Sequence, residues 1–163
     1  MKTGFNVMLA TLLVVATMTG CGVVNNSQAT NLTYDEAKAQ ALTLVGEVGD
    51  MLPASAIVSS SDDEVRVACG DDAAQYDGIR TVSVTSEFDQ AAWLDDTAAT
   101  FEQKQGWKVE KKVAAGGSSD ATRAVAMVSP GGYYMRLGAF ADTPEGGPVM
   151  VLSASSPCAK EQS

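Results

Sequence analysis

Apolar residues recur every three or four positions between residues 37 and 52, which is the spacing of one face of an α-helix. Ahead of this stripe, Thr33 and Glu36 have the three-residue spacing of a capping box, in which each side chain bonds the backbone N–H of the other residue. Pro53 ends the pattern, because proline has no N–H group for a helical hydrogen bond. We therefore predict a helix between Thr33 and Pro53. Its inward stripe comprises Ala37, Ala41, Leu44, Val45, Val48 and Leu52.

Two later segments alternate apolar and polar residues, which is the pattern of strands with one buried face. They cover residues 65–69 and 81–85. Residues 70–78 between them are polar, acidic and bounded by glycine, which favours a turn. The sequence thus predicts two strands joined by an acidic turn.

A second helix is predicted after Ser86 and Asp89, which form a weaker capping pair. Apolar residues again recur at helical spacing, and Gly106 marks the end of the helix. Trp93 lies beside the apolar stripe and not within it. The predicted inward stripe comprises Ala91, Leu94, Ala98 and Phe101.

The C-terminal part of the chain predicts four more strands. A loop rich in glycine and serine covers residues 116–120, and the turn at residues 129–132 indicates a hairpin. The strands cover residues 107–113, 123–128, 133–140 and 149–155. Together the elements predict an α+β fold, in which an antiparallel sheet of about five to six strands has two helices on one face.

The first 20 residues have the layout of a secretory signal. Lys2 provides a positive start, and residues 5–18 provide an apolar core of about 14 residues. A membrane-spanning helix needs roughly 20 apolar residues, so a transmembrane anchor is the weaker interpretation. The core ends in Met18-Thr19-Gly20-Cys21, which resembles the lipobox of bacterial lipoproteins.

This resemblance implies that residues 1–20 are a signal peptide and that Cys21 becomes the first residue, carrying diacylglyceryl. In composition and layout the chain resembles the small surface lipoproteins of actinobacteria. We therefore expect residues 21–31 to form a flexible tether, residues 32–163 to form one domain, and the lipid on Cys21 to hold it at the extracytoplasmic face of the cell membrane. The alternative is a secreted protein in which Cys21 is a spare thiol.

Two further cysteines, Cys69 and Cys158, are expected to pair, because an exported protein meets oxidising conditions. The bond would close a loop of about 90 residues, for which the chain-entropy model gives roughly 4 to 5 kcal/mol of stabilisation, an upper figure because strain and residual structure reduce it. It would tie the last strand to the first. A redox-active pair is the weaker alternative, because the two residues lack CxxC spacing.

Charge narrows the range of partners. The leader contains Lys2 and no acidic residue, so the processed chain would have 10 basic and 20 acidic side chains and a formal charge of −10. Such a chain repels nucleic acid, and we predict no nucleic-acid partner. Its membrane attachment would depend on the lipid and not on a basic surface.

The sequence does not have the residues that several classes of catalytic and metal-binding site require. The sequence has no histidine, which removes histidine-based triads, general bases and metal sites. Acidic residues gather at 62–64, 71–77 and 95–96, but their spacing does not fit a calcium-binding EF-hand loop. We predict no catalytic residue, no metal site and no cofactor, and we interpret these acidic groups as solvated. A carboxylate-dependent enzyme is the second alternative function.

Trp93, Tyr133 and Tyr134 are the residues that we single out for a possible binding surface, because aromatic side chains combine contact area with a polar group. Trp107 is assigned to the core. The leading hypothesis is a non-catalytic binding or accessory domain for an unknown protein of the cell envelope. The first alternative is a carrier of a lipid or another hydrophobic ligand, with a cavity between the helices and the sheet.

Overall fold

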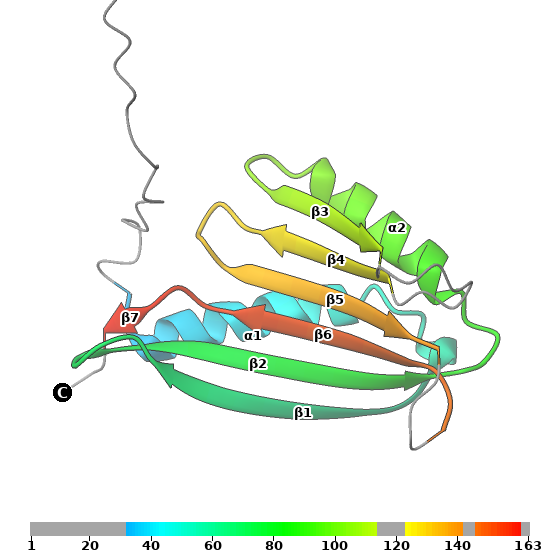
Figure 1. The fold of residues 1–163 in the computed structure, drawn as a ribbon, viewed down its shortest axis with the longest axis horizontal. Coiled ribbons are helices and arrows are strands. Elements are labelled where there is room, and N and C mark those ends of the chain that lie inside the picture. Colours follow the sequence, from blue (N-terminus) through cyan, green and yellow to red (C-terminus); the bar gives the residue numbers. More distant parts are fainter. Residues whose placement is uncertain (1–31, 114–122, 142–145, 161–163) are drawn as a thin grey trace, which may run out of the picture.

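The computed structural model describes residues 32–113, 123–141 and 146–160 (Figure 1). The proposed signal peptide, Cys21, the tether and the loop at 116–120 lie outside the described residues. In chain order the elements are helix α1 (Tyr34–Gly49), the 3-10 turn η1 (Ala54–Ala56), strands β1 (Ile57–Ala68) and β2 (Ala73–Val84), helix α2 (Gln90–Glu102), and strands β3 (Lys108–Val113), β4 (Arg123–Val128), β5 (Tyr134–Phe140), β6 (Val149–Ser155) and β7 (Ala159–Lys160).

The strands form one antiparallel sheet, and the fold is α+β as predicted. The order across the sheet is β1-β2-β6-β5-β4-β3, and the short strand β7 pairs with the first two residues of β2. β2 pairs with β6 and not with β3, because the chain crosses to the opposite edge of the sheet through α2 (Figure 1). The last long strand therefore joins the β1–β2 hairpin to the β3–β4–β5 meander.

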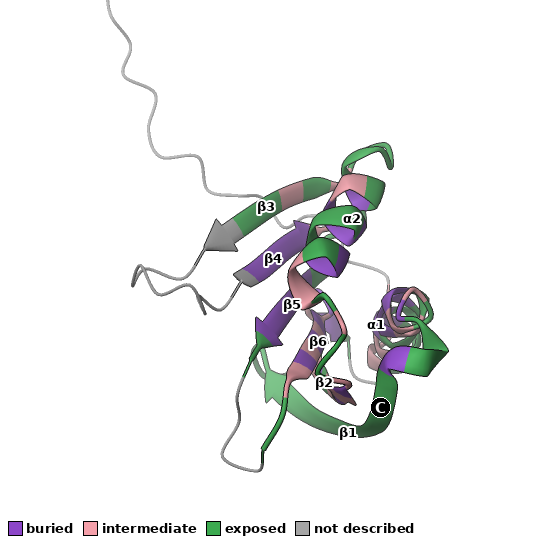
Figure 2. Cartoon of the chain, turned by 90° about the vertical axis from the view of Figure 1, so that its right-hand side faces the viewer, coloured by how far each residue is buried: buried purple, intermediate pink, exposed green. Residues whose placement is uncertain are grey.

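Both helices contribute to a single hydrophobic core. The strand register aligns Leu152, Leu137 and Val125 in one row, and all three are buried. The indole Nε1 of Trp93 in α2 donates a hydrogen bond of 3.1 Å to the carbonyl of Met51, which follows α1. Figure 2 shows the two helices on the same side of the sheet.

The start of α1 has the predicted capping box. The Thr33 hydroxyl accepts from the Glu36 N–H at 3.3 Å, and the Glu36 carboxylate accepts from the Thr33 N–H at 2.9 Å. The predicted inward stripe is buried over its whole length. The helix itself ends at Gly49, and Leu52 is reached through a tight turn in which its N–H donates to the Gly49 carbonyl.

The cap and the stripe of α2 differ from the prediction. Asp89 caps the helix by accepting from the Ala92 N–H at 2.9 Å, whereas the Ser86 hydroxyl donates to Glu87. Trp93 is buried, and Ala91 is only half-buried. The indole of Trp93 donates to the carbonyl of Met51 in the segment after α1, so this side chain lies on the buried side of the helix. The buried residues of α2 are Trp93, Leu94, Thr97, Ala98 and Phe101.

The prediction of an acidic turn at residues 70–78 is wrong, because residues 73–78 belong to β2. The turn is short, and Cys69 donates its N–H to the Ala73 carbonyl at 2.9 Å. Tyr76, which lies within the misassigned segment, is buried in the core. β1 also begins earlier than predicted, and it has no buried face: Val65 is 60% exposed, because the strand lies at the edge of the sheet.

The remaining strands follow the prediction closely. β4 and β5 form the predicted hairpin, in which the Ser129 N–H donates to the Tyr133 carbonyl at 2.9 Å. Gly132 has φ +82°, a conformation that glycine adopts without a Cβ clash. β3 and β6 occupy the ranges that alternation indicated, whereas β7 was not predicted.

The predicted disulfide between Cys69 and Cys158 is present. Cys69 follows β1, and Cys158 lies between β6 and β7, with 89 residues of separation in sequence. The bond therefore holds the tip of the β1–β2 hairpin to the segment that leads into β7. β7 in turn is linked to the residues just before α1 by a hydrogen bond of 3.1 Å, which the Lys160 N–H donates to the Leu32 carbonyl.

Candidate ligand-binding pocket

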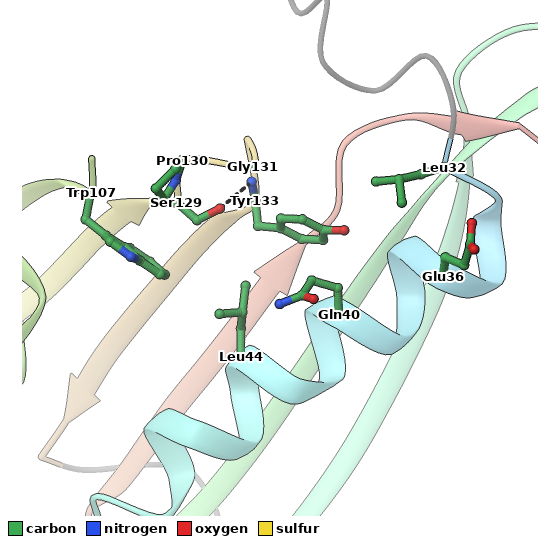
Figure 3. Close-up of a pocket in the computed structure, with 9 residues that line it drawn as sticks. All are labelled: Leu32, Glu36, Gln40, Leu44, Trp107, Ser129, Pro130, Gly131 and Tyr133. Carbon is green, nitrogen blue, oxygen red and sulfur yellow. Dashed lines mark hydrogen bonds between the residues drawn. The ribbon is translucent and has the colours of Figure 1, made fainter. Parts of the chain in front are cut away.

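A pocket lies between the N-terminal half of α1 and the turn that joins β4 to β5 (Figure 3). Its volume is about 490 Å³. The lining residues are Leu32, Glu36, Gln40, Leu44, Trp107, Ser129, Pro130, Gly131 and Tyr133.

α1 contributes one row of side chains to the pocket. Glu36, Gln40 and Leu44 are four residues apart, so they share one face of the helix. Leu44 is 5% exposed, whereas Glu36 and Gln40 are exposed. The α1 wall thus changes from apolar at its deep end to polar near the beginning of the helix.

Tyr133 forms the opposite wall and is 5% exposed. Its backbone N–H donates to the Ser129 hydroxyl at 3.0 Å, which fixes the residue to the turn. Its ring lies over the pocket, and its hydroxyl is directed toward Leu32 and Glu36 (Figure 3). Burial raises the pKa of Tyr133, so the hydroxyl stays protonated and can donate a hydrogen bond at neutral pH.

Trp107 closes the far end of the pocket. Its ring packs edge-on against Phe101 of α2, with a distance of 4.6 Å between ring centroids. Gly106 before it has φ +81°, and a Cβ at this position would lie only 3.0 Å from Pro130. A glycine is therefore needed where the chain passes the β4–β5 turn, and this close approach places Trp107 beside Pro130.

Glu36 is the one charged residue among the described residues that line the pocket. Its Oε2 accepts hydrogen bonds of 2.9 Å from both the N–H and the hydroxyl of Thr33. The backbone hydrogen bond from Thr33 is the main cause that lowers the pKa of Glu36. The carboxylate is consequently ionised at neutral pH, although the side chain is exposed.

The three residues singled out in the sequence do not form one surface. Tyr133 lines the pocket, Tyr134 is 41% exposed on the opposite face of the sheet, and Trp93 is buried on the inward side of α2. Strand neighbours point to opposite faces, which separates the two tyrosines. Trp107, which the sequence assigns to the core, packs against the core but is only half-buried, and it also lines the pocket. Its position directly after Gly106 was the available signal.

The acidic residues of β1 make ion pairs along one edge of the sheet. Asp62 accepts from Arg80 of β2 at 2.7 Å, and Glu64 accepts from Lys38 of α1 at 2.7 Å. The hydrogen bond from Arg80 lowers the pKa of Asp62. Charged side chains on an edge strand also discourage pairing with a strand of another molecule. In the described residues no group of three or more acidic or cysteine side chains is placed to hold a metal ion.

Comparison of the chain with protein-family models, curated proteins and solved structures finds no match. Within residues 32–113, 123–141 and 146–160, neither helix has the length and hydropathy of a membrane-spanning helix.

Proposed function

We propose that this chain is a non-catalytic binding domain, held by a lipid on Cys21 at the outer face of a bacterial cell membrane, and that it binds a small apolar molecule between α1 and the β4–β5 turn. The observation that carries the proposal is the pocket lined by Leu44, Trp107 and Tyr133. Of the two binding hypotheses drawn from the sequence, the geometry thus favours the ligand carrier over the docking of a protein partner.

The size and lining of the pocket support a small-molecule ligand. Sites for such ligands usually have volumes of roughly 300 to 1,000 Å³ and combine apolar walls with a few polar groups. The pocket of about 490 Å³ falls in this range, and its polar groups are those of Glu36, Gln40 and Tyr133. Trp107 and Tyr133 offer aromatic surface, which gives large contact areas to an apolar ligand.

The chemistry of the lining favours binding over catalysis. The raised pKa of Tyr133 makes its phenol a hydrogen-bond donor and a poor source of a phenolate nucleophile. Glu36 is exposed, ionised and hydrogen-bonded to Thr33, which disfavours a role as general acid at neutral pH. Ser129 uses its hydroxyl to accept from the Tyr133 N–H. These assignments suit groups that position a ligand.

A blocking substitution tests the binding site. Gln40→Trp places an indole in the pocket from an exposed helical position, and Ala39→Trp places the same group on an exposed position that does not line the pocket. We expect the wild type and Ala39→Trp to bind the neutral apolar dye N-phenyl-1-naphthylamine with the same affinity. Gln40→Trp should reduce the affinity at least about tenfold, as expected when roughly 1.4 kcal/mol or more of binding free energy is lost. Equal binding by all three proteins would exclude this pocket.

The membrane location has its own test, which is the intact mass of the chain extracted from its native membrane. The expected mass begins at Cys21, includes diacylglyceryl and is two protons below the value for reduced cysteines, because Cys69 and Cys158 are bonded. A chain that retains residues 1–20 without lipid contradicts the lipoprotein assignment. The same sample, measured under native conditions, should carry an additional small mass if it contains the ligand.

A second candidate function is the docking of an envelope protein, and the face of the sheet opposite the helices favours it. Ile79, Tyr134 and Phe140 are exposed there, with Ile79 44% exposed. A photo-crosslinking amino acid at position 134, used in the native membrane, should capture a defined partner if this surface is used. Ile79→Lys should then remove the crosslink, whereas a crosslink that persists would argue against docking at this face.

A further inference from the structure

The pocket has a polar end and an apolar end. Leu44, Trp107 and Pro130 lie toward one end, whereas Glu36 and the hydroxyl of Tyr133 lie toward the other (Figure 3). The amide of Gln40 lies between them. A ligand that fills this space therefore encounters apolar surface along its body and hydrogen-bonding groups at one end.

The polar end has a negative charge that no cation of the pocket neutralises. Glu36 is the sole charged side chain among the described lining residues. Oε2 accepts both hydrogen bonds from Thr33, and no donor within the described part of the chain is bonded to Oε1. Lys38, the basic residue nearest to Glu36 in α1, is bound to Glu64 at 2.7 Å. The whole chain has a formal charge of −9, which adds to the negative field.

From this arrangement we infer that the ligand is a small amphiphile with a protonated amine, whose ammonium group binds at Glu36 and the Tyr133 hydroxyl while its apolar body lies against Leu44 and Trp107. This inference rests on the function proposed above, because it assigns the chemistry of the ligand in the same pocket. An ammonium group donates hydrogen bonds to a carboxylate, and these charge-assisted bonds are stronger than neutral ones. Both Oε1 of Glu36 and the phenol oxygen of Tyr133 can accept them.

The same geometry disfavours an anionic amphiphile. A ligand carboxylate or phosphate at this end would lie beside the ionised Glu36 and would be repelled by it. A neutral alcohol would gain the apolar contacts without gaining or losing the charge interaction. Octylammonium, octanol and octanoate have eight-carbon alkyl chains and differ in the charge of the head group. Comparison of their affinities therefore separates the contribution of the pocket walls from that of Glu36.

The test titrates the processed full chain, held in nanodiscs of uncharged lipid, with each of the three compounds. Fluorescence reports binding, because the chain has two tryptophans, of which Trp107 lines the pocket and Trp93 is buried elsewhere. We expect octylammonium to bind the wild type about tenfold more tightly than octanoate, with octanol between them. Raising the salt concentration should reduce this preference, because the site is exposed.

Glu36→Gln is the decisive variant, and Asp35→Asn is its matched control. Glutamine still forms a capping box, so the helix start is retained. Asp35 is also an exposed acid in the first turn of α1, but it does not line the pocket. We expect Glu36→Gln to bring the affinities for octylammonium and octanoate within about twofold of each other, a range that corresponds to a small free-energy difference. Asp35→Asn should keep the preference. Partition into the nanodisc lipid is the same for every variant and cancels in this comparison.

The outcomes separate the two proposals. Failure of octanol to bind the wild type overturns the proposed binding function itself. Binding of octanol without a preference for octylammonium, or a preference that Glu36→Gln and Asp35→Asn reduce equally, overturns the assignment of a cationic ligand. Glu36→Gln could destabilise the fold, which would show as a lower midpoint of urea unfolding than that of Asp35→Asn. In that case the salt titration of the wild type is the test. A preference for octylammonium that salt leaves unchanged overturns the assignment of a cationic ligand.

Discussion

α1 and α2 pack on one side of the same sheet, but with side chains of different size. α2 places Trp93, Leu94 and Phe101 in the core, and it lies along β3, β4 and β5. α1 lies along β2 and β6, and its first two buried residues are Ala37 and Ala41. Small residues allow a helix to approach the sheet closely, but they project too little to fill the space beside it.

This difference explains where the pocket forms. Phe101 and Trp107 close the space next to α2 by packing edge-on. On the α1 side, Leu44 meets the pocket at its deep end, while Gln40 and Glu36 leave the rest open to solvent. α2 therefore contributes the larger buried side chains to the core, whereas α1 contributes smaller ones and also forms one wall of the pocket. Four predictions test this comparison.

Phe101→Ala should have the largest effect, because it removes a ring that is 1% exposed and contacts Trp107. We expect the free energy of unfolding to fall by about 4 kcal/mol, within the range for truncation of a buried aromatic residue. Urea denaturation followed by circular dichroism measures the change. A loss below about 2 kcal/mol would show that α2 is less tightly packed than its buried residues indicate.

Removal of the disulfide should come next. Replacement of Cys69 and Cys158 by serine should cost about 3 kcal/mol, because the open chain gains conformational entropy in the unfolded state. The loss should also be local: the bond holds the segment that leads into β7, and β7 contacts the start of α1 through Lys160 and Leu32. Amide hydrogen exchange should therefore increase more in α1 than in α2. Equal increases in both helices would contradict this coupling.

Leu44→Ala tests the pocket side of the comparison. Leu44 is 5% exposed, yet one side of its side chain faces the pocket. We expect a loss of about 2 kcal/mol, at the low end for a buried leucine, because fewer packing contacts are lost next to an existing space. The same urea experiment applies. A loss as large as that of Phe101→Ala would mean that the two helices are equally well packed.

The smallest effect concerns alkaline pH. Burial raises the pKa of Tyr133 above that of tyrosine in the unfolded chain. Above the unfolded pKa of about 10, the unfolded state releases this proton first, so stability that is complete below that pH is lost as the pH rises. For each protein, the free energy of unfolding in urea is measured at pH 7 and at alkaline pH. The decrease between the two pH values should be smaller in Tyr133→Phe than in the wild type. Identical pH dependence in both proteins would rule out a contribution from Tyr133.

The parts of the fold that sequence patterns predicted well are those with a strong local signal. Thr33 and Glu36 cap α1 as expected, and the turn after Ser129 forms the expected hairpin. The C-terminal strands have one apolar face and were found by their alternation. In these segments the residues that decide the local structure are neighbours in the chain.

The β1–β2 hairpin shows where such patterns fail. β1 is an edge strand with every residue exposed, so burial imposes no alternation on it. In β2 the inward positions of Gly78 and Arg80 interrupt the apolar period. The ring of Tyr76 lies over Gly78, where a Cβ would collide with it, and Arg80 reaches Asp62 on the neighbouring strand. The choice of both residues depends on contacts in the folded sheet, and a pattern of apolar and polar positions along the chain does not show these contacts.

Residue type and short-range spacing were enough to predict the helices, most of the strands, the pairing of Cys69 with Cys158 and the lack of histidine chemistry. Three other features emerged only from the folded chain: β6 pairs with β2, Tyr133 and not Tyr134 faces α1, and Trp107 lines the same pocket as Glu36 and Gln40. These arrangements join segments far apart in the chain, and they depend on how side chains fill the space between the helices and the sheet.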